Sequence, residues 1–241
     1  MGGRLQRVWG RLRGWVADPL VAPLGRGLAH PRWKLWLALP LGLGLVAFDM
    51  AGPLGFDPFW ARIIPLAVTL PVYGFLSGWD RASLGLRLSP IQGWRWWVKV
   101  GLLLGAFVLA VVFVVGGLAL LAGVPAPPPL DLAATDWWGW FVNACLQAPV
   151  VEEGTYRFAL CLPLAALFGR WPALLASGVV FAVLHVLYGV PSPDNFAGGF
   201  VFAWSFLASG SLLIPMLLHC GGNLFVMGWQ AAYATVFAAW M

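Results

Sequence analysis

Charged residues are scarce in this sequence. Only 10% of its 241 residues are Asp, Glu, Lys or Arg, whereas 61% are hydrophobic, and the mean hydropathy is +0.84. A soluble domain of this length cannot bury so much apolar surface. Because a helix needs about 20 residues to cross a bilayer, the length allows roughly seven or eight membrane helices. We therefore predict an all-α fold, a polytopic transmembrane helical bundle.

Cysteine is also scarce, and its spacing indicates no site. Cys145, Cys161 and Cys220 form no CxxC motif and no paired spacing, so neither a disulfide framework nor a zinc cluster is predicted. We expect all three to be packing residues. The sequence also has no compact apolar core followed by a small-residue cleavage site. The first apolar segment is therefore expected to be a retained span rather than a cleaved signal peptide.

The positive charge is concentrated in two places. The formal net charge is +5, and the basic residues lie in blocks that flank apolar segments, at 1–34 and 81–99. This is the positive-inside pattern of membrane proteins, and it indicates no nucleic-acid partner. We interpret residues 1–32 as a basic interfacial segment on the lipid bilayer, with a disordered topology signal as the alternative, and residues 33–241 as one membrane-embedded domain. The expected location is a bacterial inner (plasma) membrane, with the N-terminus cytoplasmic.

Apolar runs of suitable length predict the individual spans, at 33–50, 59–79, 98–122, 172–188, 196–208 and 211–228. A further run, 137–168, is too long for one straight span, and Pro149 predicts a kink or break within it. Pro215 is expected to remove one hydrogen bond and to bend the last span. The apolar tail 229–241 is too short to cross upright. We place Asp49 in the link between the first two spans.

The chain has only two glutamates, and they are adjacent within the long apolar run. An ionised carboxylate at bilayer depth costs at least ~2.5 kcal/mol, so Glu152 and Glu153 are candidates for a functional site. Arg157 lies four residues after Glu153, on the same helical face, and can form an ion pair with it. Glu152 points about 100° away and is expected to have no ion-pair partner. Tyr156 and Tyr188 are interpreted as interfacial anchors, with hydrogen-bond donation near the site as the alternative.

Two further motifs repeat this four-residue spacing in separate apolar segments. Phe181 precedes His185, and His219 precedes Asn223. The order EExxxR, FxxxH and HxxxN resembles the three-motif signature of the CPBP family of intramembrane endopeptidases, which includes Abi-like proteins and the type II CAAX prenyl proteases. The motif core extends over residues 149–228.

The resemblance implies a glutamic-type protease that uses no metal. In the family, the residues that match Glu152 and His185 position the attacking water, and those that match His219 and Asn223 form the oxyanion hole. Because burial disfavours the charged form of a carboxylate, a partly desolvated Glu152 is a stronger base than a glutamate in water. It is therefore suited to take a proton from water and return it to the leaving amine.

Three further residues of the motifs are predicted to support the site or to orient the substrate. Glu153 and Arg157 would orient the helix or touch the substrate backbone, and a plain helix-packing ion pair is the alternative. Phe181 either lines the substrate groove or is an ordinary packing residue.

A zinc site is the alternative within the enzyme class. Glu152, His185 and His219 supply one carboxylate and two imidazoles, an acceptable set of catalytic zinc ligands. However, no HExxH motif is present, and Asn223 suits an oxyanion hole better than a zinc site. We therefore expect no cofactor. The absence of a GxSG motif and of an intramembrane aspartate pair argues against rhomboid-like and presenilin-like proteases.

The function predicted from these residues is an intramembrane endopeptidase that cleaves membrane-anchored peptides or proteins. The charge pattern places Glu152 in the outer half of the bilayer, so the active site is expected to open to the outer face. That orientation favours a C-terminal sorting tag over a cytosolic CAAX-like tail. The alternatives are a non-catalytic membrane immunity or peptide-binding protein, and a proton-coupled transporter. Many transporters contain an inverted repeat, and this sequence shows none, which argues against the transporter.

Overall fold

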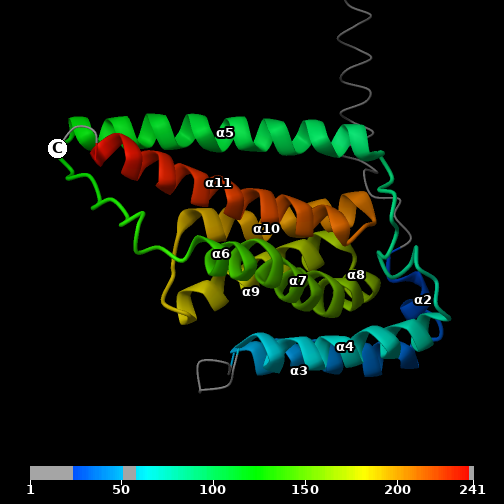
Figure 1. Ribbon diagram of the computed structural model, residues 1–241. Helices are drawn as coiled ribbons and strands as arrows, with labels where there is room; N and C mark the ends of the chain where they lie inside the picture. The colour runs from blue at the N-terminus through cyan, green and yellow to red at the C-terminus, as the bar shows by residue number, and fades with distance from the viewer. Residues whose placement is uncertain (1–23, 51–57, 239–241) are drawn as a thin grey trace, which may run out of the picture. The chain divides into compact units, whose positions relative to one another are not determined.

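The structure is a computed structural model that describes residues 24–50 and 58–238. In these ranges the regular elements are helices, with one isolated antiparallel bridge between Leu86 and Ser211 (Figure 1). The all-α prediction is therefore confirmed. The elements are α2 (Arg26–Ala29), α3 (Trp33–Met50), α4 (Pro58–Ser77), α5 (Trp94–Leu121), α6 (Trp137–Trp140), η2 (Phe141–Gln147), α7 (Ala148–Glu153), η3 (Gly154–Cys161), α8 (Leu162–Phe168), α9 (Arg170–Leu187), α10 (Pro193–Ser209) and α11 (Leu213–Ala238).

Three helices are long and apolar enough to cross a membrane: α3, α5 and α9. A shorter apolar stretch, Arg62–Ser77, lies within α4. Most side chains of α5 are exposed although nearly all are apolar, and such a surface suits hydrocarbon rather than water. Composition and helix length together indicate an integral membrane protein.

The chain divides into two compact units, and it passes from one to the other after Ile91, inside α7 after Val150, and inside α11 after Pro215. The first unit holds α2, α3, α4, η3, α8, α9 and α10. The second unit holds α5, α6, η2 and most of α11. Glu152 and His185 belong to the first unit, whereas His219 and Asn223 belong to the second.

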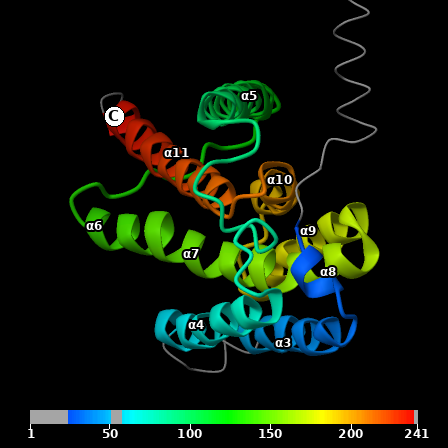
Figure 2. The ribbon, with the colours of Figure 1, turned by 90° about the vertical axis from the view of Figure 1, so that its right-hand side faces the viewer.

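The π-helical segment η3 is the centre of the first unit. All eight of its residues are buried, and it packs against α3, α4, α8, α9 and α10. One hydrophobic cluster of this core combines Val46 of α3, Tyr156 and Leu160 of η3, and Phe181 and Leu184 of α9. Helices α3 and α4 lie side by side on one flank of it (Figure 2). The segment that follows the two glutamates is therefore held on several sides.

A glycine lets α3 approach η3 closely. A Cβ atom at Gly42 would collide with the carbonyl oxygen of Ala159, so a larger residue cannot fit without moving a backbone. Next to this contact, the Tyr73 hydroxyl of α4 lies 2.6 Å from the Ala38 carbonyl oxygen and 2.7 Å from the Ala159 carbonyl oxygen. The backbones of α3 and η3 and a side chain of α4 thus meet at one point.

The predicted interfacial segment 1–32 falls mostly outside the described residues. Its described end, α2, packs against α3, α4 and α8. Leu28 is fully buried, and the Gly27 amide donates to the Ser83 hydroxyl at 2.7 Å. This end of the segment is therefore part of the first unit's core.

The long apolar run 137–168 is helical throughout, so of the kink or break predicted at Pro149 the break is absent. The hydrogen-bond register changes instead: the run contains the π-helical segments η2 and η3 between α-helical pieces. A proline has no N–H to donate, and its ring crowds the carbonyl one turn earlier. The wider π-turn of η2, directly before the turn of Pro149, accommodates this without ending the helix.

The last helix differs from its prediction at both ends. α11 begins at Leu213, so Pro215 lies in the first turn, where a backbone N–H would have no partner within the helix. The hydrogen bond that Pro215 was expected to remove is therefore not lost. The helix also continues to Ala238, so residues 229–238 are part of it rather than a separate tail.

Candidate catalytic site

The predicted ion pair of Glu153 and Arg157 is present. The Arg157 Nε atom lies 2.9 Å from the Glu153 Oε2 atom, and both side chains are 0% exposed. The guanidinium lies over the Phe181 ring, 4.8 Å from its centroid, and Nη1 donates to the Ser177 hydroxyl at 3.2 Å. Because the pair is fully buried, it offers no surface to a substrate. Through the contacts of Arg157 with Ser177 and Phe181, it holds the helix that carries the glutamates against α9.

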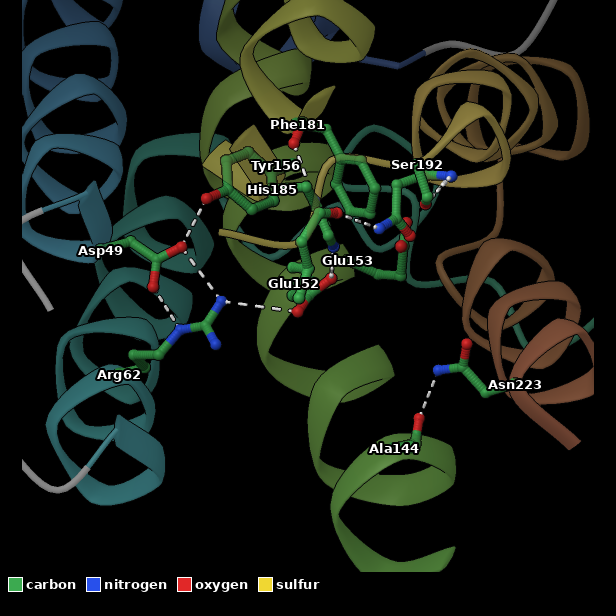
Figure 3. A network of polar contacts seen from close by, with 12 residues as sticks. Asp49, Arg62, Ala144, Glu152, Glu153, Tyr156, Phe181, His185, Ser192 and Asn223 are labelled. Carbon is green, nitrogen blue, oxygen red and sulfur yellow. Dashed lines mark hydrogen bonds and ion pairs between the residues drawn. The ribbon is translucent and has the colours of Figure 1, made fainter. Parts of the chain in front are cut away.

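Glu152 has a different environment from its neighbour. Its Oε2 atom lies 3.9 Å from the Nε2 atom of His185, and its Oε1 atom lies 3.8 Å from the Nη2 atom of Arg62 (Figure 3). The residue is 8% exposed. The prediction that Glu152 has no ion-pair partner is therefore wrong, because Arg62 of α4 faces it.

Arg62 is itself held by Asp49 of α3. The Arg62 Nε and Nη2 atoms face the two carboxylate oxygens of Asp49, and the Nη2–Oδ2 distance is 3.0 Å. The Tyr156 hydroxyl donates to Oδ2 of the same carboxylate, and the Tyr188 hydroxyl donates to the Asp49 carbonyl oxygen at 2.7 Å. Asp49 is 1% exposed. Polar contacts thus run from Tyr156 through Asp49 and Arg62 to Glu152 (Figure 3).

The sequence analysis missed this part of the site. It placed Asp49 in a link, but Asp49 is a buried residue in the last turn of α3. It gave no role to Arg62. For Tyr156 and Tyr188 it preferred interfacial anchoring, whereas the alternative, hydrogen-bond donation near the site, is what the structure shows, since both hydroxyls donate to Asp49. A signal was available: Asp49 and Arg62 are opposite charges at the facing ends of consecutive apolar runs. Charges in such positions are expected to pair.

His185 lies in the last turn of α9, and a backbone carbonyl holds its ring. Its Nδ1 atom is 2.9 Å from the Phe181 carbonyl oxygen, and the two rings are 4.4 Å apart. A carbonyl only accepts, so Nδ1 is the nitrogen that carries hydrogen in the neutral imidazole, and Nε2 is an acceptor. The acceptor nitrogen is therefore the one that faces Glu152.

An apolar cleft of about 380 Å³ adjoins His185. It lies along α9 and the turn that leads into α10. Its lining residues are Val179, Ala182, Val183, His185, Val186, Pro191, Ser192, Pro193 and Phe196. Phe181, in contrast, is 1% exposed and is a core residue. The cleft rather than the Phe181 ring is the surface on which an apolar ligand can reach His185.

In the second unit, Asn223 of α11 binds the helix that precedes Pro149. Its Nδ2 atom donates to the Ala144 carbonyl oxygen (Figure 3). In a π-helix a carbonyl accepts from the N–H five residues later, which for Ala144 is Pro149, and proline has none. The N–H of Ala148 is bound to the Asn143 carbonyl. Asn223 therefore satisfies a carbonyl that the helix leaves without a donor.

The donor set of the first unit does not by itself resemble a metal site. Among the residues that the structure describes, no group of three or more His, Cys, Asp or Glu side chains could hold a metal ion. Asp49 is bound to Arg62 and Tyr156, which leaves Glu152 and His185. The zinc set weighed as the alternative in the sequence analysis would also take His219, which belongs to the second unit.

A carboxylate that faces an imidazole acceptor inside apolar helices is an arrangement suited to activating water in a helical membrane protein. Residues 134–225 match the family model of the type II CAAX prenyl endopeptidases, Rce1-like. The chain thus carries, over these residues, a domain of the Rce1-like type II CAAX prenyl endopeptidase (CPBP) family, which is a family of proteases. Neither a curated protein nor a solved structure matches the chain.

Proposed function

We propose that this protein is an intramembrane endopeptidase that cleaves membrane-anchored peptides or proteins with water activated by Glu152. The observation that carries the proposal is the 3.9 Å approach of Glu152 Oε2 to His185 Nε2, with the other ring nitrogen bound to the Phe181 carbonyl. The family match over 134–225 supports the same reaction class.

The first step is the attack of water on the scissile carbonyl carbon. Glu152 Oε2 and His185 Nε2 are both acceptors, so a water molecule between them donates one hydrogen to each. Its lone pairs are then directed to the substrate. As the water oxygen bonds to the carbonyl carbon, Glu152 takes the proton, and the carbonyl oxygen becomes an oxyanion.

The second step is collapse of the tetrahedral intermediate. We assign the oxyanion donors to His219 and Asn223, which match the third motif of the family. An amide nitrogen carries two hydrogens, so Asn223 can bind the Ala144 carbonyl with one and the oxyanion with the other. Glu152 then gives its proton to the leaving nitrogen, the C–N bond breaks, and an amine and a carboxylic acid are released.

Glu153, Arg157 and Phe181 support this site without touching the substrate. The buried ion pair fixes the helix that presents Glu152, and the Phe181 carbonyl sets the tautomer of His185. Each of the three acts on a neighbouring residue rather than on the substrate, which agrees with the burial of its side chain.

We further propose a membrane protein of seven or eight spans in a bacterial inner membrane, with a cytoplasmic N-terminus and a site open to the outer face. The apolar cleft beside His185 suits the apolar flank of a peptide that enters from the bilayer. A C-terminal sorting tag with its own hydrophobic span is the substrate class that fits this orientation, ahead of a CAAX-like tail.

The proposal is tested by comparing peptide termini in membrane and secreted fractions by mass spectrometry. Cells carry the wild-type protein, Glu152→Gln, or the control Asp194→Asn, at equal abundance. Asp194 is exposed at the start of α10, so Asp194→Asn removes one carboxylate that is not among the proposed catalytic residues. Endopeptidase activity predicts a set of termini that disappears only in Glu152→Gln. Identical termini in all three would reject the proposal and favour a peptide-binding protein or a transporter.

A further inference from the structure

The apolar cleft beside His185 has a small residue at its floor. Ala182 lies three residues before His185 on α9, and both line the cleft. Ala182 is only 8% exposed. Three valines of the same helix, Val179, Val183 and Val186, also line the cleft and are 43–59% exposed. The valines therefore stand at the rim, and the methyl group of the alanine limits the depth.

We propose that this cleft binds the side chain of the substrate residue whose carbonyl is attacked, and that Ala182 determines which side chains fit. The inference rests on the proposed function, because it names a substrate-binding surface of the same site. It assigns the cleft to one uncharged, apolar residue. Ala182 is then a specificity-determining residue, at a position that the FxxxH spacing leaves open.

The size of the cleft decides between a side chain and a whole helix as its occupant. Its volume is about 380 Å³, which is at the lower end of the range for clefts that enclose a small ligand. One turn of an α-helix, about 10 Å wide and about 5.4 Å long, already occupies roughly 420 Å³. A membrane-anchored substrate therefore places a side chain rather than a helical turn in the cleft, and its chain must be unwound near the scissile bond.

The lining of the cleft favours an uncharged side chain. Its polar residues are His185 and Ser192, and the other lining residues are Val, Ala, Pro and Phe. The Ser192 hydroxyl already accepts from the Asn195 amide as the N-cap of α10. No Asp, Glu, Lys or Arg lines the cleft, so a charged side chain would lose its hydration without gaining a salt bridge. A large apolar side chain would instead bury its surface against the valines and Phe196.

The position of Glu152 decides which side of the scissile bond faces the cleft. In the proposed reaction Glu152 gives its proton to the leaving nitrogen, so that nitrogen must lie within hydrogen-bond reach of the carboxylate. His185 lines the cleft, and Glu152 does not. With the water held between the two side chains, the leaving nitrogen lies towards Glu152 and the acyl residue towards His185. The residue before the cut therefore reaches the cleft, and the residue after it does not.

The test reads the residues on both sides of each cut. Full-length protein in lipid nanodiscs is incubated with solubilised membrane proteins from the host cells, and new termini are sequenced by mass spectrometry. The wild-type protein should cut after large apolar residues and rarely after charged ones. Ala182→Leu fills the floor of the cleft, so cleavage after leucine, phenylalanine and methionine should fall by about 10-fold or more relative to cleavage after alanine and glycine. The preference for the residue after the cut should not change.

A matched control makes the same change on the same helix. Ala176 belongs to α9 but does not line the cleft, so Ala176→Leu should retain the wild-type preference. A second variant alters the cleft in the opposite direction. Phe196 lines it from α10 and is 56% exposed, so Phe196→Ala should fold, and it should raise the share of cleavage after tryptophan and tyrosine. This variant decides the question if Ala182→Leu does not fold or cleaves nothing.

Two results would overturn the proposal. One is an unchanged distribution of residues before the cut in Ala182→Leu and Phe196→Ala, and the other is a change confined to the residue after the cut. Both results require that the wild-type protein produces termini that Glu152→Gln does not. If such termini are absent, the endopeptidase itself is rejected, so the two failures are distinct.

Discussion

The amide nitrogen of Asn223 donates to the carbonyl oxygen of Ala144, which has no donor within its own helix. The proposed oxyanion donor thus also has a structural function in the second unit. A loss of activity after its substitution could therefore come from either function, and the helix itself offers a way to separate them.

Pro149→Ala should supply the missing N–H to the Ala144 carbonyl. In the wild-type background, Asn223→Ala leaves that partly buried carbonyl without its donor and should destabilise the protein by about 1 kcal/mol. In the Pro149→Ala background this cost should shrink, while the loss of activity, about 10²–10³-fold for an oxyanion donor, should remain. Unfolding in detergent and the rate of terminus release measure the two effects. Activity that recovers together with stability would show that Asn223 is purely structural.

Phe181 and His185 should respond differently to truncation. His185→Ala removes the acceptor that faces Glu152 and should lower the cleavage rate by about 10²–10⁴-fold with little loss of stability. Phe181→Ala retains the carbonyl that binds His185 but empties a buried site, so it should cost about 3–5 kcal/mol of stability. The rate per folded molecule separates the two variants. An equal loss of rate in both would argue that the Phe181 ring contacts the substrate.

The Glu153–Arg157 pair should be a structural contact. Arg157→Met leaves a buried carboxylate without its cation and should destabilise the protein by about 3–5 kcal/mol. Glu153→Gln together with Arg157→Met removes both charges and should recover much of this loss. Chemical unfolding of both variants in the same detergent gives the comparison. A double variant that is no more stable than the single one would contradict the assignment.

Two glycines of α3 provide a matched pair for the contact with η3. Gly42→Ala forces a Cβ atom onto the Ala159 carbonyl oxygen and should lower the unfolding midpoint. A Cβ atom added at Gly44 would meet no atom within 4 Å, so Gly44→Ala should be neutral or stabilise the helix by up to about 1 kcal/mol. If both variants have the same midpoint, the close approach of α3 and η3 is not present in the membrane.

Local spacing was sufficient for part of the site. The Glu153–Arg157 pair follows from a separation of four residues, and apolar run length locates α3, α9 and the helical run around the glutamates, although not its continuity through Pro149. Helical periodicity also predicts that the two glutamates point in different directions: Glu153 is buried against Arg157, and Glu152 faces His185.

The remaining contacts depend on which helices pack together, and no local pattern gives that. Asp49 of α3 pairs with Arg62 of α4. Glu152 meets both Arg62 and His185 because η3, which follows it, packs against α3, α4 and α9. The π-helical register of η2 and η3 also cannot be predicted from the types of residue in these segments. Its consequence, a carbonyl that needs Asn223, could not be predicted from composition.

The most direct test of the central claim is hydrolysis in water enriched in oxygen-18. Protein in nanodiscs is incubated with solubilised membrane proteins from the host cells, and new C-termini are sequenced by mass spectrometry. Water activated by Glu152 predicts new C-termini that each carry an oxygen-18 atom with the wild-type protein and with Asp194→Asn, and none with Glu152→Gln. Labelled termini that form equally well with Glu152→Gln would contradict the claim.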